Sequence, residues 1–272
     1  MKLFIVSIAV LLLVSCSKND SKKKTISHAP TQLKIAAWNV EYSKNATAAE
    51  IGEALKSYNF DVVCFSEAPG GIWTQEVGKT MGLNYSSVGK YSTAGHEDKF
   101  KTIASRTPLY DFEEVLMADT LHTATKVKTK INNYEIAVYA VHFPFGWRDQ
   151  AHIDETTHKV VTFVNYLKSK QPGEIAVVAG DFNFIPSNSD STSMYYEMFV
   201  DMGMDVTWKD LGIDCTKRNT WNAFEPKHNG NGEVIDHIIY QTDKMKVLDG
   251  EIIEMDKLLS DHKPVWALLQ LK

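Results

Sequence analysis

The stretch Glu174–Pro186 constrains the fold most, because it joins an uninterrupted apolar run to closely spaced polar residues. The run Ile175–Ala179 is short enough to be a buried strand rather than a helix. Gly180 ends it, and Asp181 and Asn183 follow on alternate positions, which extended backbone directs to one face. In α/β proteins the carboxyl end of a strand is where sites commonly form. The same letters are typical of an Asx turn, so the stretch alone leaves both interpretations open.

Alternating strand and helix patterns surround this stretch and predict an α/β domain. Helices are expected from the capping box at Thr47 to Tyr58, and over Gly71–Met81, Asp149–Lys168 and Thr192–Met202. Strands are expected over Leu33–Trp38, Asp61–Phe65, Thr102–Ser105, Phe112–Met117, Thr123–Lys130, Tyr134–Val141, Val234–Tyr240, Val247–Met255 and Val265–Leu271. The three strands between Thr102 and Lys130 are predicted to form a meander, and the segment before them, Tyr85–Lys99, is expected to be rich in loops.

Polar residues recur where the predicted strands end or begin. The set consists of Asn39, Glu67, His142, Asp181, Asn183, Asp236, Asp261 and His262. Taken alone, each residue could equally belong to a surface turn or be a core residue whose hydrogen bonds are satisfied. Together they suit one task, because carboxylate oxygens bind Mg²⁺, imidazole and carboxamide groups stabilise phosphoryl oxygens, and a metal-free carboxylate accepts a proton from water.

The N-terminus has the pattern of an export signal. Lys2 precedes the apolar run from Leu3 to Val14, which is too short to span a bilayer. The sequence Leu-Val-Ser before Cys16 resembles a bacterial lipobox, so we expect residues 1–15 to be a signal peptide and Cys16 to be lipidated and membrane-anchored. Residues 16–32 are predicted to be a flexible tether and residues 33–272 the catalytic domain. An ordinary secretory signal with an incidental cysteine is the alternative.

Charge argues against a nucleic-acid substrate. The formal net charge of the chain is −5 and it has only three arginines, at positions 106, 148 and 218. Binding to duplex DNA requires a basic face, which the linear pattern does not supply. Arg148 precedes a predicted helix and is a candidate anion contact, although a surface arginine is the commoner case. Cys64 lies in an apolar run and is expected in the core.

The order of the polar motifs resembles that of the endonuclease/exonuclease/phosphatase superfamily. The motifs W-N, S-E, V-H-F, G-D-F-N-F, I-D-H-I and S-D-H-K-P-V occur in the order and spacing typical of this superfamily, from Leu33 to the C-terminus. Each motif is weak alone, whereas G-D-x-N followed by a terminal S-D-H-x-P-V is specific. The resemblance implies a four-layered α/β sandwich of two packed mixed sheets flanked by helices, and a metal-dependent phosphoesterase.

The resemblance also implies a metal site. Glu67 is expected to be the principal ligand of Mg²⁺ or Mn²⁺, with help from Asn39 and Asp261. For Asp261 the resemblance leaves a second role open, the support of its neighbour. Family members often have glutamine before the metal-binding glutamate, and this chain has Ser66 instead.

The resemblance implies that the remaining residues bind the phosphate and position or activate the attacking water. His262 is expected to contact the scissile phosphate, oriented by Asp236. Asp181 is expected to position or deprotonate the attacking water, and Asn183 and His142 to hold phosphate oxygens. Glu97 is a candidate support for His142.

The departures from the family pattern narrow the range of expected substrates. Ile185 and Asp236-His237 stand where inositol polyphosphate 5-phosphatases carry a basic residue and an aspartate-arginine pair, which argues against that subfamily. We therefore expect a monomeric exported hydrolase of a small-molecule or lipid phosphate ester. An extracytoplasmic DNA endonuclease is the alternative within the fold, and an inactive binding lipoprotein is the alternative outside enzymes. Since all eight polar positions are filled, the enzyme is favoured.

Overall fold

The computed structural model describes residues 30–145, 149–184, 193–215, 217–221, 234–255 and 257–272. The signal peptide, Cys16, most of the predicted tether, Arg148 and Ile185 lie outside these residues. Among the described residues, no helix is both long and apolar enough to cross a bilayer.

Two six-stranded mixed sheets form the centre of the domain, as predicted. The first has the order β11 (Met245–Ile252), β12 (Val265–Leu271), β1 (Gln32–Asn39), β2 (Val62–Ala68), β4 (Phe100–Ser105) and β3 (Tyr85–Val88). The second has the order β5 (Leu109–Leu116), β6 (Thr123–Ile131), β7 (Tyr134–His142), β8 (Ile175–Asp181), β10 (Asp236–Gln241) and β9 (Met204–Val206).

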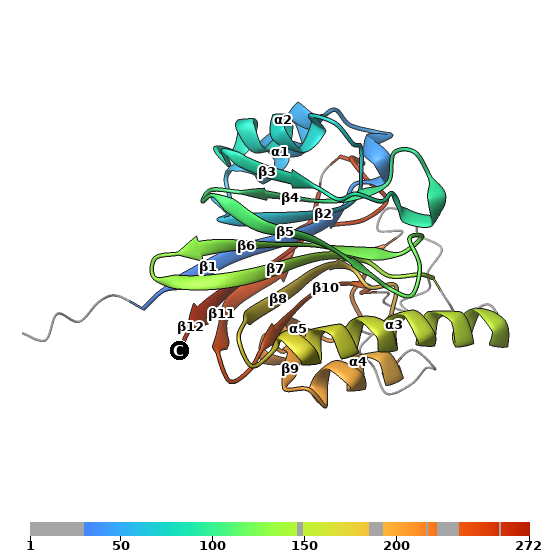
Figure 1. Cartoon of the computed structure of the whole chain (residues 1–272). Helices are drawn as coiled ribbons and strands as arrows, with labels where there is room; N and C mark the ends of the chain where they lie inside the picture. The colour runs from blue at the N-terminus through green and yellow to red at the C-terminus, as the bar shows by residue number, and fades with distance from the viewer. Residues whose placement is uncertain (1–29, 146–148, 185–192, 216, 222–233, 256) are drawn as a thin grey trace, which may run out of the picture.

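Helices cover the outer faces and complete four layers (Figure 1). On the first sheet lie α1 (Ala48–Lys56) and α2 (Trp73–Met81), and on the second lie α3 (Gln150–Lys170) and α4 (Ser193–Val200). The short helix α5 (Thr207–Asp210) follows β9, and two 3₁₀ turns, η1 (Glu41–Ser43) and η2 (Thr93–Gly95), lie in the first half of the chain. The capping box at Thr47 is present, as predicted.

The central strands read as continuous apolar runs because both of their faces are buried. Along β1, Ile35 and Ala37 belong to the core cluster that also contains the inner strands of the second sheet. Ala36 and Trp38 belong instead to the cluster under α1 and α2. Strands covered on both faces lose the alternation of apolar and polar residues that marks a half-exposed strand.

Strand direction explains why one end of the sandwich collects the polar residues. Strands β1 and β2 are parallel, as are β7 and β8, so their carboxyl ends lie at one edge. Strand β12 is antiparallel to β1 and β10 is antiparallel to β8, so these two strands begin where their neighbours end.

Three details differ from the sequence prediction. Ser66 and Glu67 lie inside β2 rather than after it, at an irregularity in the pairing with β4. Strand β3 lies in the segment predicted to be rich in loops. The predicted meander is formed by β5, β6 and β7, whereas β4 belongs to the other sheet.

Candidate active site

The structure brings all eight predicted polar residues to one end of the two sheets. They are Asn39, Glu67, His142, Asp181, Asn183, Asp236, Asp261 and His262. His142 and Asp181 are register partners at the ends of β7 and β8, and Asp236 pairs with Asp181 across the antiparallel ladder. Arg148 and Cys16, the other two predicted site residues, lie outside the described residues.

Asp181 lies at the centre of this arrangement. Its Oδ2 accepts a hydrogen bond from Asn39 Nδ2 at 3.0 Å. The same oxygen lies 3.5 Å from His142 Nε2 and 3.8 Å from His262 Nε2. Only 1% of the residue is exposed. Burial and then the charge of Asp236 raise the pKa of the Asp181 carboxyl. Its carboxylate therefore binds a proton more readily than that of an ordinary aspartate.

The approach of β7 to β8 requires glycine before Asp181. Gly180 has φ +149, and a Cβ there would lie 2.1 Å from the carbonyl oxygen of Val141. The two strands can therefore place His142 and Asp181 side by side only with glycine at this position. The glycine of the G-D-F-N motif thus has a steric role in the site.

His262 is held by a buried carboxylate. Its Nδ1 lies 2.8 Å from Asp236 Oδ2, which directs Nε2 toward Asp181. The indole Nε1 of Trp38 donates to the backbone oxygen of His262 at 2.9 Å and fixes the chain there. Burial by itself lowers the pKa of an imidazole, but the charges of Asp236 and Asp181 outweigh it and raise the pKa of His262.

Glu67 is directed by a distortion in β2. Its φ of +48 is unusual for a residue other than glycine, and it lies at the irregularity in the strand pairing. Glu67 Oε1 is 3.8 Å from His142 Nε2, and Oε2 is 2.6 Å from Lys99 Nζ. Lys99 was not predicted, since it approaches from a segment 32 residues away that carries no motif.

Two further residues complete an acidic group beside Glu67. Asp261 accepts from Trp221 Nε1 at 3.3 Å. Burial and then the nearby charges of Glu41 and Glu67 raise the pKa of Asp261, against the opposing charge of His262. Glu41 was also missed by the sequence analysis, although its position two residues after Asn39 is a signal that could have found it. Its backbone N–H donates to Asn39 Oδ1 at 3.0 Å.

Two sets of residues could hold a cation. The acidic group Glu41, Glu67 and Asp261 supplies oxygen donors whose charges repel one another, which suits a hard divalent ion. The inner group Asp181, Asp236 and His262 places one donor atom of each residue within 4.8 Å of the others. In the inner group, however, Asp236 already holds Nδ1 of His262. The acidic group has the oxygen donors that Mg²⁺ or Mn²⁺ prefers, whereas among the described residues only the inner group brings three donor atoms within 4.8 Å of one another.

Ser66 joins the two sheets directly behind the site. Its hydroxyl donates to the backbone oxygen of Val141 at 2.8 Å and accepts from the backbone N–H of Asp181 at 3.3 Å. Ser66 is fully buried, so this bridge between the two sheets is made inside the protein, away from solvent. The departure from the family pattern at this position thus has a structural role.

His142 and Asn183 also lie against Asp181, His142 at Oδ2 and Asn183 at Oδ1. Asn183 Nδ2 donates to the backbone oxygen of Phe143 at 2.8 Å, and its backbone N–H donates to Asp181 Oδ1 at 2.9 Å. His142 Nδ1 is buried and finds no hydrogen-bond partner among the described residues. The expected support from Glu97 is therefore wrong, since Glu97 is exposed to solvent.

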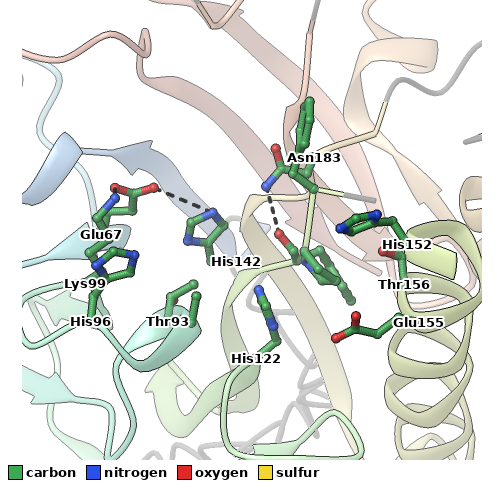
Figure 2. A pocket seen from close by; sticks show the side chains of 14 residues that line it. Glu67, Thr93, His96, Lys99, His122, His142, His152, Glu155, Thr156 and Asn183 are labelled. Atoms are coloured by element: carbon green, nitrogen blue, oxygen red, sulfur yellow. Dashed lines mark hydrogen bonds and ion pairs between the residues drawn. The ribbon is translucent and has the colours of Figure 1, made fainter. Parts of the chain in front are cut away.

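A cavity of about 480 Å³ opens beside Glu67, His142 and Asn183. Figure 2 shows Thr93, His96 and Lys99 on one side of it and His152, Glu155 and Thr156 of α3 on the other. His122 lies between these two sides, below His142. Phe143, Pro144 and Phe145 complete the lining.

Solved structures share this fold at low sequence identity. An endonuclease/exonuclease/phosphatase from Beutenbergia cavernae matches with a TM-score of 0.73 and 17% identity, covering 89% of this chain and 72% of that one. An AP endonuclease from Archaeoglobus fulgidus matches at 0.68 and 16%, covering 86% and 98%. A 3′ phosphatase from Neisseria, bound to a product DNA hairpin, matches at 0.67 and 17%, covering 86% and 98%. A search of curated protein sequences gave no match.

The family model with the description Endonuclease/Exonuclease/phosphatase family matches residues 36–262. This range contains all eight clustered residues as well as Glu41 and Lys99. Members of the family are hydrolases that act on phosphoester bonds. The chain therefore belongs to the endonuclease/exonuclease/phosphatase family.

Proposed function

We propose that the protein is an exported, divalent-metal-dependent hydrolase of a small-molecule or lipid phosphate ester. The observation that carries the proposal is the convergence of Asn39, His142 and His262 on the buried carboxylate of Asp181, directly beside the acidic group. Hydrolysis of a phosphate ester needs a proton acceptor for water and positive charge for the phosphoryl oxygens. The site offers both within a few ångströms.

Asp181 is proposed to orient the attacking water and take its proton. Asn39 fixes the carboxylate through one oxygen and the backbone of Asn183 fixes the other. A carboxylate held at both oxygens keeps one orientation toward its substrate, which is the geometric condition for general base catalysis. The raised pKa of Asp181 makes it a stronger base than an exposed aspartate.

His262 and His142 are proposed to bind phosphoryl oxygens. His262 is held in its protonated form by Asp236, so its Nε2–H donates a charge-assisted hydrogen bond. His142 and the carboxamide of Asn183 face the same space from β7 and from the residues that follow β8. Donors preorganised around developing negative charge stabilise the transition state more than the ground state.

Glu67 and Asp261, with Glu41 and Asn39 beside them, are proposed to hold Mg²⁺ or Mn²⁺. When bound, a divalent ion supplies Lewis-acid polarisation of a phosphoryl oxygen. Lys99 pairs with Glu67 in the protein as described and would have to release it. Lys99 then remains close enough to contribute positive charge to the substrate.

Export and anchoring are proposed from the sequence of residues 1–16 alone. Lipidation of Cys16 would tether the catalytic domain through residues 17–32 to a membrane outside the cytoplasm. Metabolic labelling with an alkyne fatty acid tests this: the wild-type chain should incorporate the label and Cys16→Ser should not. Equal labelling of both chains would rule out Cys16 as the anchor.

A substrate panel tests the proposed reaction. The purified chain is incubated with Mg²⁺ or Mn²⁺, with and without EDTA, on plasmid DNA, bis-p-nitrophenyl phosphate, p-nitrophenyl phosphate, sphingomyelin and sugar phosphates. We expect chelator-sensitive turnover of a small-molecule or lipid ester that is lost in Asp181→Asn and His262→Ala. Turnover of DNA alone would instead support the nuclease, despite the acidic charge. Metal binding without any turnover would support a binding protein.

A further inference from the structure

His237, the residue after Asp236, takes no direct part in the proposed reaction. It stands where inositol polyphosphate 5-phosphatases carry the arginine of an aspartate-arginine pair. Both residues of the pair are fully buried in β10. Successive side chains of a strand point to opposite faces, so Asp236 reaches His262 at the site while His237 points away from it. The imidazole of His237 instead contacts the residues that follow β8.

The hydrogen bonds of His237 define one neutral tautomer. Its Nε2 lies 2.7 Å from the backbone oxygen of Phe184, and its Nδ1 lies 3.1 Å from the indole Nε1 of Trp208. A carbonyl oxygen can only accept a hydrogen bond, and an indole N–H can only donate one. The hydrogen of the imidazole therefore lies on Nε2, which donates to Phe184, and Nδ1 accepts from Trp208.

Two hydrogen bonds to residues 235 and 237 hold both chain neighbours of Asn183. The backbone N–H of Phe182 donates to the backbone oxygen of Ile235 at 2.8 Å, and the backbone oxygen of Phe184 accepts from His237. The imidazole also packs against the rings of Phe182 and Phe184, with centroids 5.4 and 5.7 Å away. The start of β10 thus fixes the chain on both sides of Asn183.

Asn183 benefits from this support because its backbone conformation is uncommon. Its φ of +53 lies in the left-handed region, which few residues other than glycine adopt, although asparagine does so more readily than most. In this conformation its backbone N–H donates to Asp181 Oδ1 at 2.9 Å. Its Nδ2 donates to the backbone oxygen of Phe143 at 2.8 Å (Figure 2). A shift of Phe184 would therefore disturb both the carboxamide of Asn183 and a contact of Asp181.

We propose that His237 is a positioning residue for the hydrolysis, whose Nε2–H holds the backbone of Phe184 and thereby directs Asn183 toward the phosphate and Asp181. The inference rests on the proposed function, since it assigns His237 to the same site. Because His237 is fully buried, it acts through Phe184 and Asn183 and not by contact with the substrate. The role depends on a hydrogen-bond donor at one atom as well as on the size of the side chain.

Two nearly isosteric variants of the full chain test the donor. His237→Gln keeps an N–H that can reach Phe184 and an oxygen that can accept from Trp208, whereas His237→Met has neither. We expect kcat for the best ester of the panel to fall about 10- to 100-fold in His237→Met, with a smaller change in KM, because a displaced donor loses mainly transition-state binding. His237→Gln should recover most of this loss. Tyr240→Phe, which removes a hydrogen bond to Asp210 from the same strand, is the control and should keep the wild-type kcat.

NMR of the folded chains tests the positioning without any turnover. The ¹H–¹⁵N signals of the Asn183 backbone amide and carboxamide report the hydrogen bonds that these groups donate. We expect both signals to move upfield in His237→Met, as the bonds lengthen, and to stay closer to their wild-type positions in His237→Gln. Both variants lack the imidazole ring, so the comparison between them removes the effect of the ring current. The amide signal of Tyr139 inside β7 should be the same in all chains.

Equal kcat values and equal Asn183 signals in His237→Met and His237→Gln would overturn the inference, even if the wild type hydrolyses an ester. A lower melting temperature of His237→Met with kcat and Asn183 signals at wild-type values would assign His237 to the fold alone. If His237→Met does not fold, Trp208→Phe removes the donor to Nδ1 and should move the Asn183 signals in the same direction, whereas unchanged signals would contradict the role. If the signals move as expected but no ester is hydrolysed by the wild type, the proposed function fails and the link from His237 to Asn183 stands.

Discussion

The inner group and the acidic group lie side by side but compensate their charges in different ways. Asp181, Asp236 and His262 are at most 5% exposed and pair with one another and with Asn39. The side chains of Glu41, Glu67 and Asp261 are between 15% and 37% exposed. Two of these three pair with lysines, Lys44 and Lys99.

This difference indicates which half of the site the protein completes by itself. In the inner group an imidazolium lies between two carboxylates, so the protein supplies its own counter-charge. In the acidic group, burial and then the charges of Glu41 and Glu67 raise the pKa of the Asp261 carboxyl. A group of this kind gains most from a cation taken from solution.

Replacing the central carboxylate should have the largest effect. In Asp181→Asn the proton acceptor is lost while size and the contact with Asn39 are nearly kept. We expect kcat to fall by about 10²–10⁴-fold, the usual contribution of a general base. Steady-state hydrolysis of the best ester of the panel measures it. The exposed Asp201→Asn is the matched control and should keep wild-type activity. A drop of less than tenfold in Asp181→Asn would remove Asp181 from the role of base.

Removing the charge that holds His262 should destabilise the fold. Asp236 is fully buried, so Asp236→Asn leaves an imidazolium with a weaker partner. We expect the free energy of unfolding to fall by about 3 kcal/mol, as for other broken buried pairs. Urea denaturation measures it, and Asp243→Asn, at an exposed ion pair, should change it little. Equal stability of the two variants would show that the inner group is not paired as described.

The partly buried His122 sharpens the comparison with His262, because its surroundings lower rather than raise the pKa of the imidazole. His122 lies 3.2 Å from the ammonium of Lys159, and its pKa is lowered to about 4. The unfolded chain therefore binds a proton below about pH 6.5 that the folded chain rejects until about pH 4, so stability falls as pH falls through this window.

His122→Asn should remove this part of the pH dependence. Between pH 6.5 and 4, the free energy of unfolding should fall in both chains, but by up to about 3 kcal/mol less in the variant than in the wild type. Urea denaturation at several pH values measures the difference, and His158→Asn, on the exposed face of α3, is the control. Parallel pH profiles for the wild type and His122→Asn would show that His122 titrates normally.

Weakening the acidic group should have a smaller effect that metal can reverse. Glu67→Gln keeps the shape of the side chain but removes one charge. We expect activity at limiting Mg²⁺ to fall about tenfold or more and to recover in part at high Mg²⁺. The exposed Glu53→Gln, which only loses an ion pair with Lys56, should match the wild type. Loss of activity that no Mg²⁺ concentration restores would argue for a different role of Glu67.

The sequence predicted the inner group better than the acidic group, for a physical reason. Asp181 and Asp236 adjoin short, uninterrupted apolar runs, and buried strands are easy to recognise from such runs. Glu41 lies in a 3₁₀ turn with φ +44, and Lys99 reaches Glu67 from another loop. Neither position lies on a periodic apolar pattern. Glu41 has one local signal, its place two residues after Asn39, whereas only the tertiary structure reveals Lys99.

The same physical reason explains which parts of the fold were predicted. The central strands and the two sheets were predicted, whereas β3 was missed because Tyr85–Val88 is short and partly exposed. The cavity could not be predicted at all. Thr93 and Thr156 come from segments 63 residues apart and carry no shared motif. Residues that loops bring together leave no local signal in the sequence.

The most direct test of the account is a Mg²⁺ titration of hydrolysis in three chains, namely the wild type, Asp181→Asn and Glu67→Gln. If the acidic group holds the cation and the inner group performs proton transfer, the two variants should differ in kind. Glu67→Gln should shift the Mg²⁺ midpoint upward, and Asp181→Asn should lower the maximal rate at an unchanged midpoint. A midpoint shifted by Asp181→Asn and unchanged by Glu67→Gln would place the cation at the inner group and contradict the account.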